Sequence, residues 1–560
     1  MDDQFKTDQS TPPAVTPTNS SPPSGDRPSD TNLTTPDSPG ETPVTQAQVG
    51  QTPKKGKMRW FIFGLVILVV AGAAAYALNK VNKPEKTATQ SVKKSVALVR
   101  FGVTQPFPMD FYPKADSSIL PLEINNQIFE GLTKYQSGNQ IVPNLAQSWT
   151  NPDNNTWVFK LLPNLQFHNG HSLAAKDVKD SLDALQSTDY GKAYGTTIKT
   201  VTAVDAGTVK IVTAAPDPLL PSELANLWIY DTSSTTPNDP GNGSGPYSLK
   251  QGTKITADGV QLSANNSYHG GTPMVKELDF KFYADTKTEV ADLKSKNLDV
   301  ADLGSKAAVS EVTSYGYKEY GDKSTQVNFL MPNTLKPGSP LGNLNVRKAI
   351  YEAVDPIAVM KADGRTGIAA TQLVSQDIPG YNPAITRPKL DPTQAKADLI
   401  AAGFPTGITL TFTYFASHQP LAEELQKELA TIGVKLTLDP QTVGSVLGKK
   451  ALGGQTDLFY YGYGSSLIDS SDVIQPLVVD TANYKNTKLD EAYSQASTTF
   501  NTVARLKQLQ AINQLAMDDV AVIPLYTPDA LYFAVKSNLV IGTDNLSNYS
   551  GVDFWKVYAQ

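Results

Sequence analysis

The sequence predicts an α/β fold, because segments with the composition of strands alternate with segments that have helical spacing. Residues 96–103 are rich in valine and include phenylalanine, which favours a strand. Residues 345–355 place their apolar side chains on one side of a helix. Residues 409–414, 421–432 and 433–436 have the patterns of a strand, a helix and a second strand, which together indicate a β-α-β unit.

Length and composition limit the possible functions. A chain of 560 residues is too long for a single hydrophobic core, so we expect two or three packed parts. The net charge of -6 leaves no basic surface, and we therefore expect no nucleic-acid partner. The chain has no cysteine, which excludes disulfides, thiolate catalysis and cysteine-based zinc sites.

The N-terminal region predicts three segments ahead of the globular body at 96–560. Residues 1–58 are dominated by Pro, Thr, Ser and Asp, a composition typical of a disordered tail. Residues 59–79 are almost entirely apolar and long enough to cross a bilayer as one transmembrane helix. Residues 80–95 form a lysine-rich linker. The triplet Ala75-Tyr76-Ala77 is compatible with signal cleavage, so removal of the apolar segment stays open.

The opening part of the body carries a dense series of local signals. Gly131 follows a run with helical spacing and suits a left-handed helix stop. A polar run at 151–155 between alternating residues indicates a hairpin. The expected elements, in order, are a helix at 124–132, a turn at 141–143, a short helix at 144–148, a hairpin at 149–160, a tight turn at 167–170 and a helix that begins at Ser172.

Later segments add a second hairpin at 201–211 and a helix at 391–403. Gly243 and Gly245 permit another backbone segment to approach closely. Arg347 lies near the N-terminus of the helix at 345–355, where its charge opposes the helix dipole. We therefore expect an acidic or carbonyl partner for this arginine and a bracing role in the structure.

Several short motifs, taken together and in order, resemble one protein family. They are EGL at 130–132, IVPNLAQSW at 141–149, FHNG at 167–170, AKDV at 175–178, GSGPY at 243–247, NVRKAI at 345–350 and IPLY at 523–526. This order is similar to that of the peptide/nickel class of extracytoplasmic solute-binding proteins, the receptor subunits of ATP-binding-cassette (ABC) importers. The resemblance covers essentially residues 96–560.

The resemblance implies a two-lobed clamshell of three domains that captures a solute between its lobes. The implied boundaries are lobe I at about 96–132, 241–330 and 527–560, an inserted subdomain at about 133–240, and lobe II at about 331–526. The implied partners are a peptide or another small solute and ABC permease subunits. Such a receptor faces outward, and without a cysteine to carry a lipid the predicted transmembrane helix becomes its single-pass anchor.

The resemblance also implies where the ligand lies. In the family a loop after the first strand runs along the cleft, and a tryptophan- and aspartate-containing segment grips the peptide's α-ammonium. We expect ligand contacts from Thr104, Gln105, Asp110, Tyr461, Tyr463, Ser465, Ser466, Asp469 and Arg365. The tyrosines predict either a stacking wall or a core strand, and Arg365 either a carboxylate clamp or a solvated loop residue.

One departure from the family pattern bears on the substrate. Ser466 takes the position of the ammonium-binding aspartate, and Asp469 that of the second aspartate. A neutral serine cannot replace a charge partner for a buried ammonium. Either Asp469 has moved into that role or the ligand has no free α-amine there, which leaves N-blocked or longer peptides and other solutes open.

Enzyme chemistry finds little support in the sequence. His168 and His171 have the spacing of a metal pair, but His168 belongs to the FHNG turn. No Gly-x-Ser-x-Gly elbow surrounds Ser465. We expect a non-enzyme without a cofactor or metal. Two classes stay open: a membrane-tethered importer receptor, and a non-transport ligand sensor or surface interaction protein with the same clamshell.

Overall fold

The computed structural model describes residues 93–104, 122–136, 140–195, 197–233, 243–256, 258–304, 306–542, 546–547 and 551–560. The predicted tail at 1–58, the predicted transmembrane helix at 59–79 and nearly all of the predicted linker lie outside these residues. Within them, no helix has the length and hydrophobicity needed to cross a bilayer.

A mixed 12-stranded sheet organises the described chain, and ten of its strands follow the order β16-β15-β17-β13-β18-β11-β1-β10-β9-β8. The other two, β12 and β14, pair with β18. The bounds are β1 Val96–Thr104, β8 Tyr247–Leu249, β9 Gly259–Ala264, β10 Val275–Tyr283, β11 Val300–Asp302, β12 Tyr317–Lys323, β13 Gln326–Pro332, β14 Gly367–Ala369, β15 Ile408–Phe415, β16 Val434–Gln441, β17 Leu458–Gly464 and β18 Ile523–Lys536.

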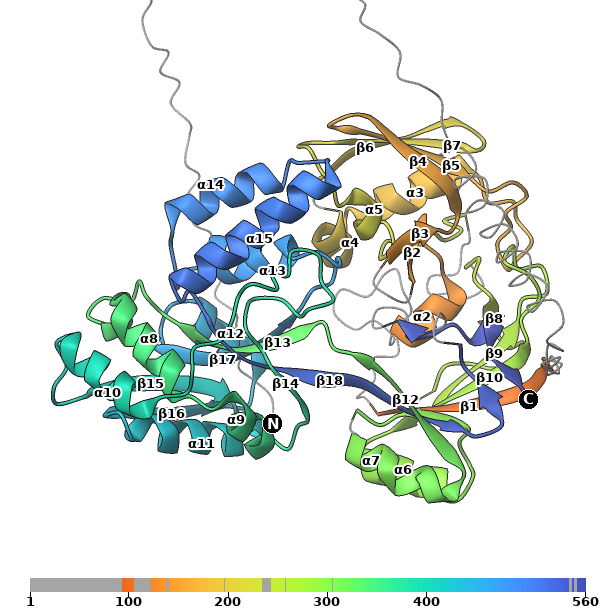
Figure 1. The fold of residues 1–560 in the computed structure, drawn as a ribbon. Coiled ribbons are helices and arrows are strands. Elements are labelled where there is room, and N and C mark those ends of the chain that lie inside the picture. Colours follow the sequence, from red (N-terminus) through yellow and green to blue (C-terminus); the bar gives the residue numbers. More distant parts are fainter. Residues whose placement is uncertain are drawn as a thin grey trace, which may run out of the picture. The chain divides into compact units, whose positions relative to one another are not determined.

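Strand β18 passes through both parts of this sheet (Figure 1). Its first residues pair with β13 and β14, and its last residues pair with β11 and β12. The chain also crosses between the two parts at Ser324–Thr325, which link the end of β12 to the start of β13. We call residues 93–323 and 530–560 the first half, residues 326–527 the second half, and the two crossing segments at 324–325 and 528–529 the junction.

The first half has two hydrophobic cores, one around Phe101 and Phe280 and a smaller one around Leu293 and Leu298. Strand β1 pairs in parallel with β10 and β11. A separate four-stranded antiparallel sheet has the order β4-β5-β7-β6. The remaining first-half elements are α2 Leu122–Ile128, β2 Thr133–Gln136, β3 Gln140–Pro143, β4 Ala146–Asp153, β5 Thr156–Leu161, α3 Ala175–Leu185, α4 Asp189–Tyr194, β6 Ile198–Asp205, β7 Thr208–Thr213, α5 Leu220–Glu223, α6 Thr286–Lys294, α7 Lys306–Val312, β19 Leu539–Val540, β20 Leu546–Ser547, β21 Gly551–Val552 and β22 Tyr558–Ala559.

The second half is built on one large core, to which Tyr135 and Ala225 of the first half also contribute. The predicted β-α-β unit is confirmed, with β15 and β16 parallel and joined through α11. The helices are α8 Leu344–Ala353, α9 Pro356–Ala362, α10 Pro392–Ala401, α11 Gln419–Ala430, α12 Gly444–Leu452, α13 Ser471–Ile474, α14 Thr487–Ala496 and α15 Thr502–Asp518.

Several local predictions are confirmed. Both hairpins form, as β4–β5 and β6–β7. The turn at 167–170 closes with a hydrogen bond from the Gly170 amide to the Phe167 carbonyl, and Gly170 has a φ of 84°. Gly243 lies against the end of α2, where a Cβ atom would come within 2.0 Å of the Ile128 carbonyl oxygen. The glycine is needed there because the two backbones touch.

Three boundaries differ from the prediction. Residues 144–148 are not helical, because β4 begins at Ala146 and pairs with β5. The helix predicted from Ser172 begins at Ala175. Helix α2 ends at Ile128, and Gly131 does not have a positive φ. A Cβ atom at Gly131 would lie 2.3 Å from the Leu224 carbonyl oxygen, so close packing rather than a left-handed stop accounts for this glycine.

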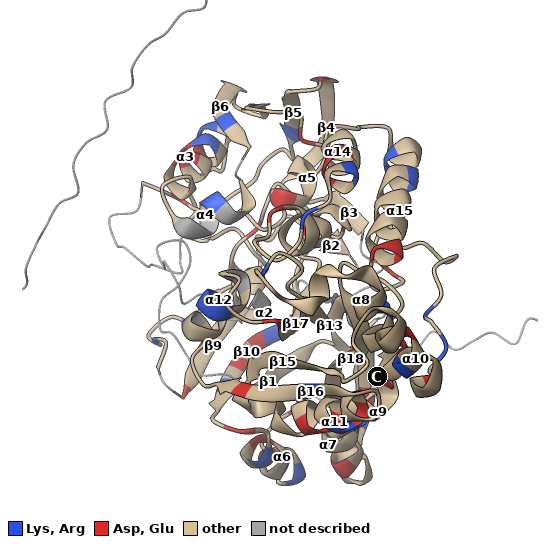
Figure 2. Ribbon diagram, turned by 90° about the vertical axis from the view of Figure 1, so that its left-hand side faces the viewer, with Lys and Arg blue, Asp and Glu red and all other residues tan. Residues whose placement is uncertain are grey.

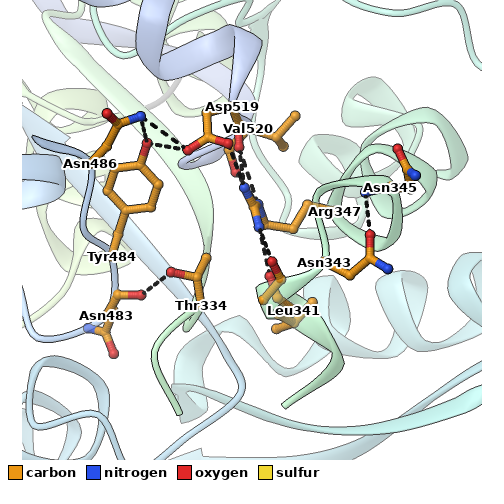
Figure 3. A network of polar contacts seen from close by, with 11 residues as sticks. Thr334, Leu341, Asn343, Asn345, Arg347, Asn483, Tyr484, Asn486, Asp519 and Val520 are labelled. Atoms are coloured by element: carbon orange, nitrogen blue, oxygen red, sulfur yellow. Dashed lines mark hydrogen bonds and ion pairs between the residues drawn. The ribbon is translucent and has the colours of Figure 1, made fainter. Parts of the chain in front are cut away.

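Arg347 on α8 braces the second half, as its position predicted (Figure 3). Its guanidinium donates to the carbonyl oxygens of Leu341, Asp519 and Val520, at 2.9, 2.6 and 3.1 Å. A further bond of 3.0 Å reaches the Asp519 carboxylate, which also accepts from the Tyr484 hydroxyl. The arginine therefore ties α8 to the end of α15 through main-chain acceptors.

Charged residues of both signs are interspersed on helices α3 and α6, as the blue and red ribbon segments of Figure 2 show. On α3 the pairs Lys176–Asp180 and Lys179–Asp183 are spaced four residues apart. Such pairs on a helix surface keep the local net charge low.

Candidate functional site

Strand β17 brings the two predicted tyrosines together on one face of the sheet. The ring centroids of Tyr461 and Tyr463 are 6.0 Å apart, and both rings are half-buried against the second-half core. Burial raises the pKa of Tyr463 to about 12, so its phenol is neutral at physiological pH. The pair thus has features of both predicted roles, a wall of rings and a part of the core.

The loop after β17 is held by an acid that the sequence reasoning missed. One oxygen of Asp472 lies 2.8 Å from the Ser465 Oγ, and the other accepts from the backbone amides of Ser466 and Leu467 at 2.6 and 2.9 Å. The Ser466 Oγ also donates to Asp472, at 3.1 Å. Burial raises the pKa of Asp472 to about 6, while these donors oppose the rise. The sequence does contain a signal for this role, because Asp472 lies in the first turn of a helix that follows a serine-rich loop.

Asp469 is used inside the chain. Its carboxylate forms a buried ion pair with Arg505 of α15 and accepts from the Ser471 amide at 2.9 Å. Arg505 also donates to the Ser471 Oγ at 2.9 Å and to the Ala496 carbonyl at 3.1 Å. This geometry does not support the expectation that Asp469 replaces the missing ammonium-binding aspartate, because its charge already has a partner.

Tyr135 brings the first half to the same loop. Its hydroxyl lies 3.0 Å from the Ser466 carbonyl oxygen and 3.0 Å from the Ser222 carbonyl oxygen. The amide of Asn226 donates to it at 3.1 Å. Since a hydroxyl has one proton, the two carbonyls share it. A second contact between the halves joins Trp157 to Phe500, whose ring centroids are 6.0 Å apart.

A cavity of about 150 Å³ lies at the junction. Its wall includes residues of both crossing segments, of β14 and of the loop that follows it: Ser324, Ile368, Ser375, Gln376, Asp377, Thr527, Pro528 and Asp529. Gly464, at the end of β17, pairs with Gln326. A Cβ atom on Gly464 would lie 3.2 Å from the Oγ1 of Thr325, the residue that follows Ser324 of the cavity wall.

The other predicted residues are placed as follows. Arg365 is 47% exposed at its side chain and pairs with the buried Asp363, 3.1 Å away. Asp363 also binds His418 and the Tyr526 hydroxyl, each at 2.8 Å. Thr104, at the end of β1, donates to the carboxylate of Glu289 on α6. Gln105 and Asp110 lie outside the described residues.

The two histidines that have the spacing of a metal pair, His168 and His171, form hydrogen bonds with different acceptors. The Nε2 of His168 lies 2.9 Å from the Gly245 carbonyl oxygen, and the Nδ1 of His171 lies 2.7 Å from the Asp231 carboxylate. Across the part of the chain that the structure describes, no three histidine or acidic side chains come together as a metal site would require.

Comparison with known proteins identifies the kind of protein that shares these features. Residues 140–485 match the family model described as bacterial extracellular solute-binding proteins, family 5 Middle. The dipeptide-binding protein of Escherichia coli K12 is 25% identical over 398 residues, covering 62% of this chain and 71% of that protein. The glutathione-binding protein GsiB of Shigella flexneri is 24% identical over 447 residues, covering 74% and 86%.

Solved structures share the fold. HbpA2 from Haemophilus parasuis superposes with a TM-score of 0.73 at 22% identity, covering 83% of this chain and 100% of that one. DppA from Helicobacter pylori, solved with the peptide STSA, gives a TM-score of 0.67 at 20% identity, covering 83% and 98%. The described chain thus has the α/β fold of periplasmic binding proteins with mixed sheets.

Proposed function

Because this chain belongs to the bacterial extracellular solute-binding proteins of family 5, we propose that it is the substrate-binding subunit of an ABC importer. It captures a peptide or a related solute between two lobes and delivers it to permease subunits. The observation that carries the proposal is the junction, where two halves with largely separate cores are joined by two crossing segments beside a cavity.

Two features support capture between the halves. The crossing segments 324–325 and 528–529 are short, and short connecting segments absorb the dihedral changes of hinge closure. Tyr135 and Ser466 meet across the halves next to the predicted site. A ligand held at this place gains contacts from both halves only when they are apposed, and such differential affinity drives closure.

Peptides are the proposed solute class because the relatives are named for peptides: a dipeptide-binding protein and a glutathione-binding protein. Ser466 carries no charge, and the carboxylates of Asp469 and Asp472 are already bound by Arg505 and by donors of the loop. We therefore propose that no α-ammonium is bound at the loop itself.

We further propose that residues 59–79 anchor the protein in the membrane, with residues 96–560 outside the cytoplasm. The length and apolar composition of this segment, with no cysteine for a lipid, support the proposal. Fractionation of cells that express the full chain is expected to place it with membranes, and deletion of 59–79 to release it. Recovery of a mature chain that begins after Ala77 contradicts the anchor.

Thermal unfolding of the full chain tests the binding function. A ligand that binds only the native state raises its stability by about 2.7 kcal/mol at a hundredfold excess over Kd. We expect a shift with peptide pools, free or N-acetylated, and none with oligosaccharides or nickel. A shift with sugars or nickel alone would replace peptides as the solute. Binding of peptides by a chain that supports no uptake in its host would favour a sensor over an importer receptor.

A further inference from the structure

We propose that the surface formed by the first and last described residues of the globular body binds the anionic lipid headgroups of the membrane. We call this surface the terminal patch and define it by six residues: Lys93, Lys94, Lys276, Trp555, Lys556 and Tyr558. The proposal goes beyond solute capture, and it rests on the proposed function only where the anchor at 59–79 keeps the body near a bilayer. It gives the body a second contact with the membrane, separate from the anchor.

Backbone pairing brings the terminal patch together from distant parts of the chain. The backbone groups of Lys94 and Ala559 exchange two hydrogen bonds, of 3.1 and 2.9 Å, which place the start of β1 beside the last residues (Figure 1). The amide of Met274 donates to the Trp555 carbonyl at 2.9 Å, and the amide of Val96 donates to the Met274 carbonyl at 2.9 Å. The segments that carry the patch are therefore fixed to one another by main-chain bonds.

Two lysines lie over aromatic rings of the patch. The Nζ of Lys93 is 4.9 Å from the centroid of the Tyr558 ring, and the Nζ of Lys556 is 4.9 Å from the centroid of the Trp555 ring. Both aromatic residues are half-buried, and the Trp555 ring packs edge-on against Tyr268, with centroids 5.4 Å apart. Tryptophan, tyrosine and lysine suit a membrane–water interface because each has an apolar part and a polar end. The patch presents this combination on a fixed backbone.

The charge of the patch is opposite in sign to that of the whole chain. The chain has a net charge of -6, whereas the three segments that carry the patch contain four lysines and one acid: 93–97, 265–276 and 553–560. That acid, Asp553, lies 3.8 Å from Lys556, and the next acid along β10, Glu277, pairs with Lys250 at 2.8 Å. Even with a terminal carboxylate at Gln560 counted, four positive charges face two negative ones. Anionic headgroups are the complement of such a surface.

The place where the chain enters the body selects the membrane as the partner of the patch. Residues 80–92 connect Lys93 to the proposed anchor, and thirteen residues extend over at most about 45 Å. This connection holds the patch at a high effective concentration near the lipid surface, so that weak charge contacts suffice. A basic patch beside a membrane anchor strengthens attachment to anionic lipids, because the two signals act together.

The test measures lysine acetylation of the purified full chain in lipid nanodiscs. One kind of disc contains phosphatidylcholine alone, and the other also contains the anionic lipid phosphatidylglycerol. Each lysine near an anionic surface strengthens binding about fivefold. We therefore expect acetylation to be at least about threefold slower in the anionic discs at the four patch lysines: Lys93, Lys94, Lys276 and Lys556. The protection is expected to disappear in about 0.5 M salt.

The exposed Lys435 on β16 and Lys449 on α12, both in the second half, serve as internal references. They are expected to react at the same rate in both kinds of disc, because neither belongs to a segment that carries the patch. A difference at these two lysines as large as that at the patch would show a general effect of lipid charge and would overturn the proposed site.

Charge reversal locates the effect. The double variant Lys93→Glu, Lys94→Glu is expected to abolish the protection of the other two patch lysines. Both substituted side chains are exposed, so the melting temperature is expected to match that of the wild type. The double variant Lys435→Glu, Lys449→Glu changes the net charge by the same amount at exposed positions of the second half. It is the matched control and is expected to keep the full protection.

The outcomes separate the lipid site from the anchor. A chain that stays with phosphatidylcholine discs in high salt is held by its anchor. If its patch lysines react equally in both kinds of disc, or if the control variant also loses the protection, the lipid site is overturned while the anchor stands. If the chain leaves phosphatidylcholine discs but binds anionic discs, and Lys93→Glu, Lys94→Glu abolishes that binding, the anchor fails and the lipid site holds.

Two further results would overturn lipid binding. A chain that leaves both kinds of disc and shows no protection contradicts the lipid site and the anchor together. Protection that appears in both kinds of disc and rises with protein concentration would identify a second copy of the chain as the partner of the patch. Solute capture is measured separately, by the thermal shift with peptides, so neither result decides it.

Discussion

The two sides of the site differ in how their polar groups are used. In the loop at 465–472, both oxygens of Asp472 and the carboxylate of Asp469 are occupied by donors of the same chain. On the cavity wall, the Ser375 Oγ has no partner among the described residues and two acids face solvent. Polar groups that are satisfied within the chain stabilise its structure, whereas exposed acids are accessible from solvent.

Breaking the ion pair between Asp469 and Arg505 tests whether the loop at 465–472 has a structural role. Asp469→Ala leaves the guanidinium of Arg505 buried without a charge partner, and loss of one member of a buried pair costs about 3–5 kcal/mol. We expect a lower unfolding midpoint in urea, with the slope unchanged. Asp183→Ala, at an exposed pair on α3, is the control and is expected to lose less than about 0.5 kcal/mol. Equal losses in the two variants would contradict the structural role of Asp469.

Glu289, in the first half, has one carboxylate oxygen that is bound within the chain and one that is not. It is fully buried, Thr104 binds one of its oxygens, and the other has no partner among the described residues. Burial raises the pKa of Glu289 to about 7, with Asp302 adding to the rise. The native state therefore holds the proton more tightly than the unfolded chain, so stability is fully present below about pH 4.5 and falls as the pH rises to about 7.

Glu289→Gln removes this dependence. Above pH 7 the buried charge costs about 3 kcal/mol, so the variant is expected to exceed the wild type in stability by up to that amount at pH 8. At pH 4.5 the two chains are expected to be nearly equal. Urea unfolding at both pH values measures the difference. A variant less stable than the wild type at pH 8 shows that the ionised carboxylate has a favourable partner instead.

Tyr135→Phe tests the contact between the halves. The variant loses the hydroxyl that the Ser466 and Ser222 carbonyls share, a net loss of about 1 kcal/mol. We expect about fivefold weaker peptide binding, because the lost bond forms only when the halves are apposed. Tyr247→Phe is the matched control, since its hydroxyl bonds the Val275 carbonyl within the first half at 3.0 Å. It is expected to lower stability but not affinity.

Asp377→Asn has the smallest expected effect on stability. The residue is exposed, and neutral changes at such positions stay within about 0.5 kcal/mol. Its melting temperature without ligand is therefore expected to match that of the wild type. A large loss of stability would show that Asp377 stabilises the folded chain.

The sequence alone determined the fold class and much of its local structure. Alternating residues predicted both hairpins, helical spacing predicted α8 and α11, and the glycines at 243 and 245 predicted a close backbone approach. The position of Arg347 predicted its carbonyl and carboxylate partners. These features depend on neighbours in sequence or on one backbone group, and their patterns are therefore visible in a single chain.

Only the tertiary structure decided how the site residues are used. Asp469 and Arg505 are 36 residues apart, and no local pattern joins them. Asp377 and Asp529 reach one cavity from distant segments because β14 pairs with β18. Residues 144–148 were misassigned because β5 provides the hydrogen bonds that make them a strand. Charge pairing, cavities and strand partners are long-range properties, and folding settles them through contacts that sequence spacing does not record.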